Sequence, residues 1–126
     1  MNRTPWVVGV SGASGTPYAR AVLNAMLDAH QPVDLVISRA ARLTLLDETD
    51  VSFRDAHWQQ DLAKWLDRDV DTDGVRYWSA QDLAAGPSSG SYPTRGMVVV
   101  PASTAAVAGI AIGLSKDLLQ RAADVT

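Results

Sequence analysis

One stretch near the start of the chain decides the fold class: Trp6-Val7-Val8-Gly9-Val10-Ser11-Gly12-Ala13-Ser14-Gly15-Thr16-Pro17. Its first five residues form a short apolar run rich in valine, which is the pattern of a buried strand. A turn of glycine and serine follows. Pro17 suits the first turn of a helix, because it lacks the amide proton that a helix start leaves unpaired. The stretch therefore predicts a buried strand that turns directly into a helix.

Strands and helices alternate along the rest of the chain. In order, the sequence predicts strand 6–10, helix 17–30, strand 33–38, helix 40–46, helix 61–66, strand 75–78, strand 97–100, a helix capped by Ser103, and helix 115–123. Helices that join parallel strands bury both faces of the sheet. We therefore predict an α/β fold, a three-layer sandwich with a parallel sheet and helices on both faces, as one domain over residues 1–126.

The composition excludes several classes of protein. With 126 residues, 11 Lys and Arg against 14 Asp and Glu, and a net charge of −3, the chain has no basic block for nucleic acid. It has no cysteine, and neither His30 nor His57 has neighbours at metal-binding spacing, so we expect no metal. The apolar runs fall well short of the roughly 20 residues of a membrane helix, and no targeting segment is evident. We expect a soluble, cytoplasmic protein without a membrane span.

The turn after the first strand has the chemistry to hold a phosphate. Its glycines let the backbone approach a ligand, and the helix start offers free N–H groups and a positive dipole end. Ser11, Ser14 and Thr16 add hydroxyl groups. The spacing fits neither the P-loop, nor G-x-G-x-x-G, nor the G-x-S-x-G nucleophile elbow. The alternative is a tight strand-to-helix turn that binds nothing.

Hydroxyl residues also lie at the ends of two other predicted strands, 33–38 and 97–100. Ser38 ends strand 33–38, and Ser103 and Thr104 follow strand 97–100. The carboxyl ends of parallel strands meet at one edge of the sheet, where open α/β sheets bind their ligands. Taken alone, each serine is better explained as a helix N-cap. Together they predict a ligand site at this edge.

Six collinear segments resemble the UbiX/Pad flavin prenyltransferases, which belong to the homo-oligomeric flavin-containing decarboxylase-like flavoproteins. They are Ser-Gly-Ala-Ser-Gly at 11–15, Ser-Arg-Ala-Ala at 38–41, Glu-Thr-Asp at 48–50, Ser-Gly-Ser at 89–91, Met-Val-Val-Val-Pro-Ala-Ser at 97–103 and Arg-Ala-Ala-Asp-Val at 121–125. The resemblance implies a Rossmann-like (flavodoxin-like) FMN-binding domain in a homo-oligomer, usually a dodecamer, without a metal. It also implies transfer of a dimethylallyl group from dimethylallyl phosphate to reduced FMN. The prenylated FMN would then serve a partner UbiD-type decarboxylase.

The resemblance further assigns roles to single residues. The positions that match FMN contacts are Gly12, Ala13, Ser14, Ser38, Ser103, Thr104, Ala105 and Ala106. Ser14 and Glu48 match catalytic positions near the reacting flavin edge, where a carboxyl group could exchange protons with the leaving phosphate or the flavin. The loop that matches the prenyl-phosphate contact consists of Ser89, Gly90 and Ser91. For Glu48 alone, a solvated helix end is the alternative.

Two departures from the family pattern bear on these roles. Many members read Ser-Met-Lys-Thr where this chain has Ser-Thr-Ala-Ala at 103–106, so a lysine and a hydroxyl are absent. Members also continue past the Arg-Ala-Ala-Asp motif with residues that hold the prenyl phosphate, so we expect this chain to be truncated and, alone, inactive. The alternative function is an FMN-binding decarboxylase-like flavoprotein, or a non-catalytic fragment, without prenyl transfer.

Overall fold

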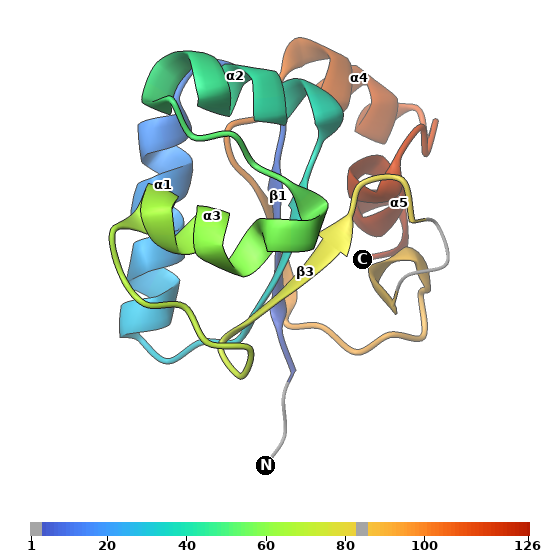
Figure 1. Cartoon of the computed structure of the whole chain (residues 1–126). Helices are drawn as coiled ribbons and strands as arrows, with labels where there is room; N and C mark the ends of the chain where they lie inside the picture. Colours follow the sequence, from blue (N-terminus) through green and yellow to red (C-terminus); the bar gives the residue numbers. More distant parts are fainter. Residues whose placement is uncertain (1–3, 83–85) are drawn as a thin grey trace.

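The computed structural model describes residues 4–82 and 86–126 and contains one parallel sheet of four strands in the order β3-β2-β1-β4 (Figure 1). The strands are β1 (Trp6–Val10), β2 (Val33–Ile37), β3 (Val75–Ser79) and β4 (Gly96–Val99). β1 pairs with both β2 and β4, so it lies in the centre of the sheet together with β2. The predicted α/β fold with a parallel sheet is confirmed, and so is the strand predicted at residues 75–78.

In the described part of the chain, five α-helices and two short 3₁₀ helices connect and cover the strands. They are α1 (Thr16–Asp28), α2 (Arg39–Thr49), η1 (Asp55–His57), α3 (Trp58–Leu66), η2 (Gly86–Ser88), α4 (Thr104–Ala111) and α5 (Leu118–Val125). The last helix begins three residues later than predicted. Ser115 has a φ of +53°, outside the helical range, and the Asp117 side chain accepts a hydrogen bond from the Gln120 N–H as the N-cap.

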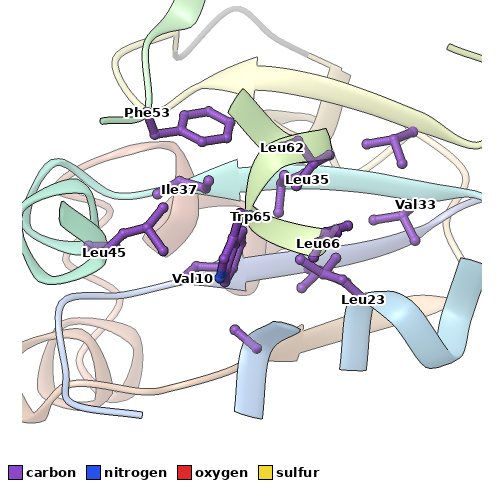
Figure 2. Packing of buried hydrophobic residues seen from close by; sticks show 14 of the residues in the cluster. Val10, Leu23, Val33, Leu35, Ile37, Leu45, Phe53, Leu62, Trp65 and Leu66 are labelled. Carbon is purple, nitrogen blue, oxygen red and sulfur yellow. The ribbon is translucent and has the colours of Figure 1, made fainter. Parts of the chain in front are cut away.

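The main core lies between the sheet and α1, α2 and α3 (Figure 2). Alternate strand residues face it, because successive side chains of a strand point to opposite sides of the sheet. Residues spaced three and four apart along the covering helices pack against these strand side chains. The fully or almost fully buried side chains of this core include Val10, Leu23, Val33, Leu35, Ile37, Leu45, Leu62, Trp65 and Leu66.

A smaller core covers the opposite face of the sheet. Val36 from β2 and Ala80 pack there against Leu118 and Leu119 of α5, and all four are buried. α4 packs on α5, and η2 lies beside α5 on the same side (Figure 1). The sheet therefore has helices on both faces, which makes the three layers that the sequence predicts.

Candidate functional site

The strand order creates one position where the chain reverses direction across the sheet. From β1 the chain steps to β2 and then β3, but β4 returns to the other side of β1. In open α/β sheets ligands bind outside the carboxyl ends of the strands at such a reversal. The turn at residues 11–15 and the segment at residues 100–103 border this position, and three helix N-termini, those of α1, α2 and α4, begin at the same edge.

Ser11 joins the two segments that border the reversal. Its Oγ donates to the Pro101 carbonyl oxygen at 2.6 Å and accepts the Ser103 N–H at 2.7 Å, and its own N–H also donates to Pro101 O. The side chain is 3% exposed. The sequence suggested Ser11 as a hydroxyl for a ligand, but its hydrogen-bonding groups bind the neighbouring segment. Its role in this chain is structural.

Gly12 allows the turn after β1 to touch the start of α2. A Cβ added at Gly12 would lie 2.5 Å from the Cβ of Ala40 and 2.9 Å from its carbonyl carbon. Real side chains do not approach so closely, and part of the obstacle is backbone. The expected FMN contact at Gly12 therefore has a second explanation, because only glycine lets the starts of α1 and α2 come together here.

Ser38 and Ser103 occupy equivalent positions at the starts of α2 and α4. The Ser38 side chain accepts the Ala41 N–H, and the Ser103 side chain accepts the Ala106 N–H, both at 3.1 Å. Both serines are N-caps, as the sequence allowed. A hydroxyl that accepts one hydrogen bond still carries its own proton, which it can donate to a ligand oxygen.

The remaining residues of the segment after β4 differ in their access to solvent. Thr104 and Ala105 are exposed, whereas Ala106 is 5% exposed and its N–H already binds Ser103. Thr104 and Ala105 can therefore offer a surface to a ligand at this edge. Ala13 and Gly12 in the facing turn are half-buried.

Glu48, at the end of α2, lies against the start of α1. Its carboxylate accepts the Ser14 Oγ–H at 3.0 Å, the Thr16 N–H at 3.1 Å and the Gly15 N–H at 3.3 Å. Gly15 is the N-cap residue of α1 and has no side chain with which to cap it. The carboxylate of Glu48 therefore caps α1 from another helix, at the place where a helix N-terminus would attract an anion.

These hydrogen bonds determine the charge of Glu48. The Thr16 N–H is the largest influence that lowers the pKa of the carboxyl group, and the Ser14 hydroxyl and Gly15 N–H add to it. Glu48 is therefore a carboxylate at neutral pH, able to accept a proton. The structure brings together the two predicted catalytic residues, Ser14 and Glu48, although 34 positions separate them in the sequence.

The Ser-Gly-Ser loop lies elsewhere. Ser89 and Gly90 line a cavity of about 370 Å³ together with Arg95 and Gly96, which precede and begin β4. Gly90 also lies beside Val125 at the end of α5. Within one copy of the chain, this loop is therefore at the amino end of β4, and the Ser14–Glu48 pair is at the opposite, carboxyl edge.

A polar cluster near the end of β3 was not predicted from the sequence. Asp55 of η1 accepts hydrogen bonds from Arg42 of α2 and from Tyr77 and Ser79 of β3. Burial raises the pKa of Asp55, but the bonds from Tyr77 and Arg42 outweigh it and lower the pKa overall. Burial and the adjacent carboxylate raise the pKa of Tyr77. The cluster ties α2 to β3 and η1.

The described residues contain neither a metal-binding cluster nor a membrane-spanning helix. Among residues 4–82 and 86–126, no three His, Asp or Glu side chains form a group that could hold a metal ion. Over the same residues, no helix is both long and apolar enough to cross a membrane.

Comparisons with known proteins agree with this architecture. The model of the flavoprotein family matches residues 1–126. A flavin prenyltransferase UbiX of Streptomyces coelicolor is 71% identical over 131 residues, covering 97% of this chain and 61% of the relative. A flavin prenyltransferase UbiX of Escherichia coli K12 is 43% identical over 120 residues, covering 94% of this chain and 56% of the relative. The chain thus spans about three fifths of the length of these relatives.

Solved structures share the fold. A UbiX protein crystallised with FMN and dimethylallyl pyrophosphate superposes with a TM-score of 0.78 at 32% identity, over 98% of this chain and 58% of that one. A dodecameric FMN-dependent UbiX-like decarboxylase of Escherichia coli O157:H7 gives a TM-score of 0.77 at 35% identity, over 97% of this chain and 60% of that one. With its family model matched from end to end and its sheet, reversal point and helix starts in place, this chain belongs to the flavoprotein family.

Proposed function

We propose that this chain is the FMN-binding part of a flavin prenyltransferase, which transfers a dimethylallyl group from dimethylallyl phosphate to reduced FMN. The observation that carries the proposal is the Ser14–Glu48 pair at the reversal point of the sheet. The 71% identity to a flavin prenyltransferase over nearly the whole chain supports it. A related UbiX protein crystallised with FMN and dimethylallyl pyrophosphate supports a flavin and a prenyl donor as the two ligands.

The donors at the carboxyl edge fit FMN. The hydroxyls of Ser38 and Ser103 stand at two helix starts, where phosphate and ribityl oxygens are favourable partners. The other expected contacts are backbone and small side chains, and those that reach the surface admit a flat ring: Gly12, Ala13, Ser14, Thr104 and Ala105. The contact expected at Ala106 is the exception, because this residue is 5% exposed and its N–H binds Ser103. Bound FMN would supply the nucleophilic ring atoms that accept the prenyl group.

Glu48 and Ser14 act on the proton balance of the transfer. When a ring nitrogen of reduced flavin gains a carbon substituent, its proton must leave, and the donor's carbon–oxygen bond breaks with its electrons on the phosphate. Glu48 is ionised at neutral pH, since the helix start lowers the pKa of its carboxyl group, so the role open to it in this step is that of the proton acceptor. Ser14 fixes the carboxylate through its hydrogen bond at 3.0 Å.

Separation of the Ser-Gly-Ser loop from the Ser14–Glu48 pair supports a site formed between copies of the chain. If Ser89, Gly90 and Ser91 bind the prenyl phosphate, they can reach a Ser14–Glu48 pair from a neighbouring copy. A homo-oligomer, with the dodecamer as the expected form, would supply that neighbour, and a related decarboxylase is dodecameric. The product would pass to a UbiD-type decarboxylase.

The domain over residues 1–126 is proposed to need the remainder of a full-length enzyme for turnover. The expected compartment is the cytoplasm, and cell fractionation would test this expectation. An FMN-binding decarboxylase-like flavoprotein without prenyl transfer is the second candidate, because the Ser38 and Ser103 hydroxyls described above would hold FMN equally well without turnover.

Supplying reduced FMN and dimethylallyl phosphate to the full-length protein separates the two candidates. Prenylated flavin, identified by mass, supports the first, and unmodified flavin supports the second. Glu48→Gln keeps the shape of the side chain but removes its charge, so it should slow transfer at least tenfold while FMN affinity stays within about twofold. Equal rates in the two proteins would refute the role of Glu48.

A further inference from the structure

A buried carboxylate lies in the middle of the sheet, away from the Ser14–Glu48 pair. Asp34 of β2 is 0% exposed and points to the same face as Val36, the face that α5 covers. Its Oδ2 accepts a hydrogen bond from the Trp78 indole N–H at 3.1 Å and another from the Tyr92 hydroxyl. Taking a carboxyl group out of water is costly unless hydrogen bonds satisfy it, so these donors offset that cost, and loss of one of them would destabilise the fold.

Tyr92 is held on its ring as well as at its hydroxyl. The ring meets Trp78 edge-on, with centroids 6.4 Å apart and planes at 85°. Gly86 lies against another part of the ring, and a Cβ added there would be 2.5 Å from Cε1 of Tyr92. Three contacts, to Asp34, Trp78 and Gly86, therefore fix the orientation of this side chain.

Tyr92 ends the loop that contains the Ser-Gly-Ser motif. Inside the loop, the Tyr92 N–H donates to Ser89 O at 3.1 Å, and the Ser89 and Ser91 hydroxyls share a hydrogen bond of 2.9 Å. On its other side, Arg121 of α5 donates to Ser88 O at 3.0 Å. The loop is therefore attached to β2 through Tyr92 and to α5 through Arg121.

We propose that Asp34 is a positioning residue for substrate binding. Through Tyr92 it fixes the loop of residues 86–92, so that the Ser89 and Ser91 hydroxyls are presented in a set arrangement to the phosphate of the prenyl donor. The identity of that ligand rests on the proposed function. The attachment of the loop to Asp34 does not.

The physical reason is preorganisation. Exposed serine hydroxyls bind a phosphate weakly if the loop must first be ordered, because ordering costs conformational entropy. Detaching Tyr92 would leave the buried Asp34 without one of its donors, and this penalty keeps the loop in one conformation before the ligand arrives. Asp34 thus acts on affinity for the prenyl donor without touching it.

Amide hydrogen exchange of residues 86–92 tests the attachment directly, without substrate. Tyr92→Phe keeps the ring but removes the hydroxyl, and it should accelerate exchange in this loop about tenfold or more. Gly86→Ala should do the same from the other side, by displacing the ring. Tyr77→Phe is the matched control, because it removes a hydroxyl from another Tyr–Asp pair, on the opposite face of the sheet. It should leave exchange in the loop unchanged.

Steady-state kinetics of the full-length protein test the consequence. Tyr92→Phe should raise the KM for dimethylallyl phosphate, and Tyr92→Ala should raise it further, to about tenfold, while FMN affinity stays within twofold. Unchanged exchange in both Tyr92→Phe and Gly86→Ala would overturn the attachment. Faster exchange with an unchanged KM in both Tyr92 variants would overturn the positioning role. A wild-type protein that transfers no prenyl group would overturn the proposed function, and exchange alone would then decide whether Asp34 holds the loop.

Discussion

Gly12→Ala tests whether the contact between the turn after β1 and the start of α2 holds the site together. The added Cβ would lie 2.5 Å from Ala40 Cβ, roughly 1 Å closer than two carbon atoms normally approach, and 2.9 Å from a backbone carbon. A long side chain could rotate away from the new methyl group, but the Cβ and backbone of Ala40 cannot, so the backbone of α2 must move. Overpacking of this kind costs typically 1–3 kcal/mol, and the backbone contact places this case at about 2–3 kcal/mol.

Urea unfolding at a fixed protein concentration measures this cost, and FMN titration by flavin fluorescence measures its effect on the site. We expect a lower unfolding midpoint and weaker FMN binding together, since Ser38 caps the displaced helix α2 and Ser14 lies in the turn that pushes against it. Gly74→Ala is the control, because a Cβ there would meet only ordinary contacts of 3.4 Å and longer. If Gly12→Ala is as stable as Gly74→Ala and binds FMN normally, the reasoning from this contact is refuted.

Two further predictions concern stability. The pKa of Glu48 is lower in the folded chain than its ordinary value of 4.5, so its contribution to stability is complete above that value and is lost as the pH falls through the folded pKa. Urea titrations between pH 7 and pH 3 should show a shallower loss for Glu48→Gln than for the wild type, and identical slopes would contradict the cap. Leu62→Ala in the main core, where Leu62 is 0% exposed, should lower the free energy of unfolding by about 2–5 kcal/mol. Lys64→Ala, at an exposed position of the same helix, should change it by less than about 0.5 kcal/mol, and similar losses in the two variants would contradict the packing of α3.

The strands could be predicted because their signal is local. Residues 6–10, 33–37 and 96–99 are short valine-rich runs, and burial on both faces of a parallel sheet requires that pattern. The start of α5 was predicted at Ser115, whereas Asp117 caps the helix in the structure. Both residue types suit an N-cap, so the sequence alone does not separate them. Only the backbone at Ser115 decides between them.

The candidate site was predictable only in part, because a sequence pattern records local signals and not distant partners. N-caps such as Ser38 and Ser103 follow their strands directly, so the sequence predicts them. The partners of Ser11, Asp34 and Tyr92 lie between 44 and 92 residues away along the chain. No periodicity or motif records such pairs. The resemblance indicated Ser14 and Glu48 together, but that Glu48 caps α1 emerged only from the structure.

Glu48 at the start of α1 gives the carboxyl edge an electrostatic polarity. The positive end of α1 is neutralised by a fixed negative charge, whereas the positive ends of α2 and α4 carry only uncharged serine caps. A ligand with a phosphate at one end and a neutral ring at the other is repelled by Glu48 at its charged end alone. Such a molecule would lie with its phosphate toward α2 and α4 and its ring toward Ser14. The charges at this edge therefore favour this orientation over the reversed one before the ring makes any contact.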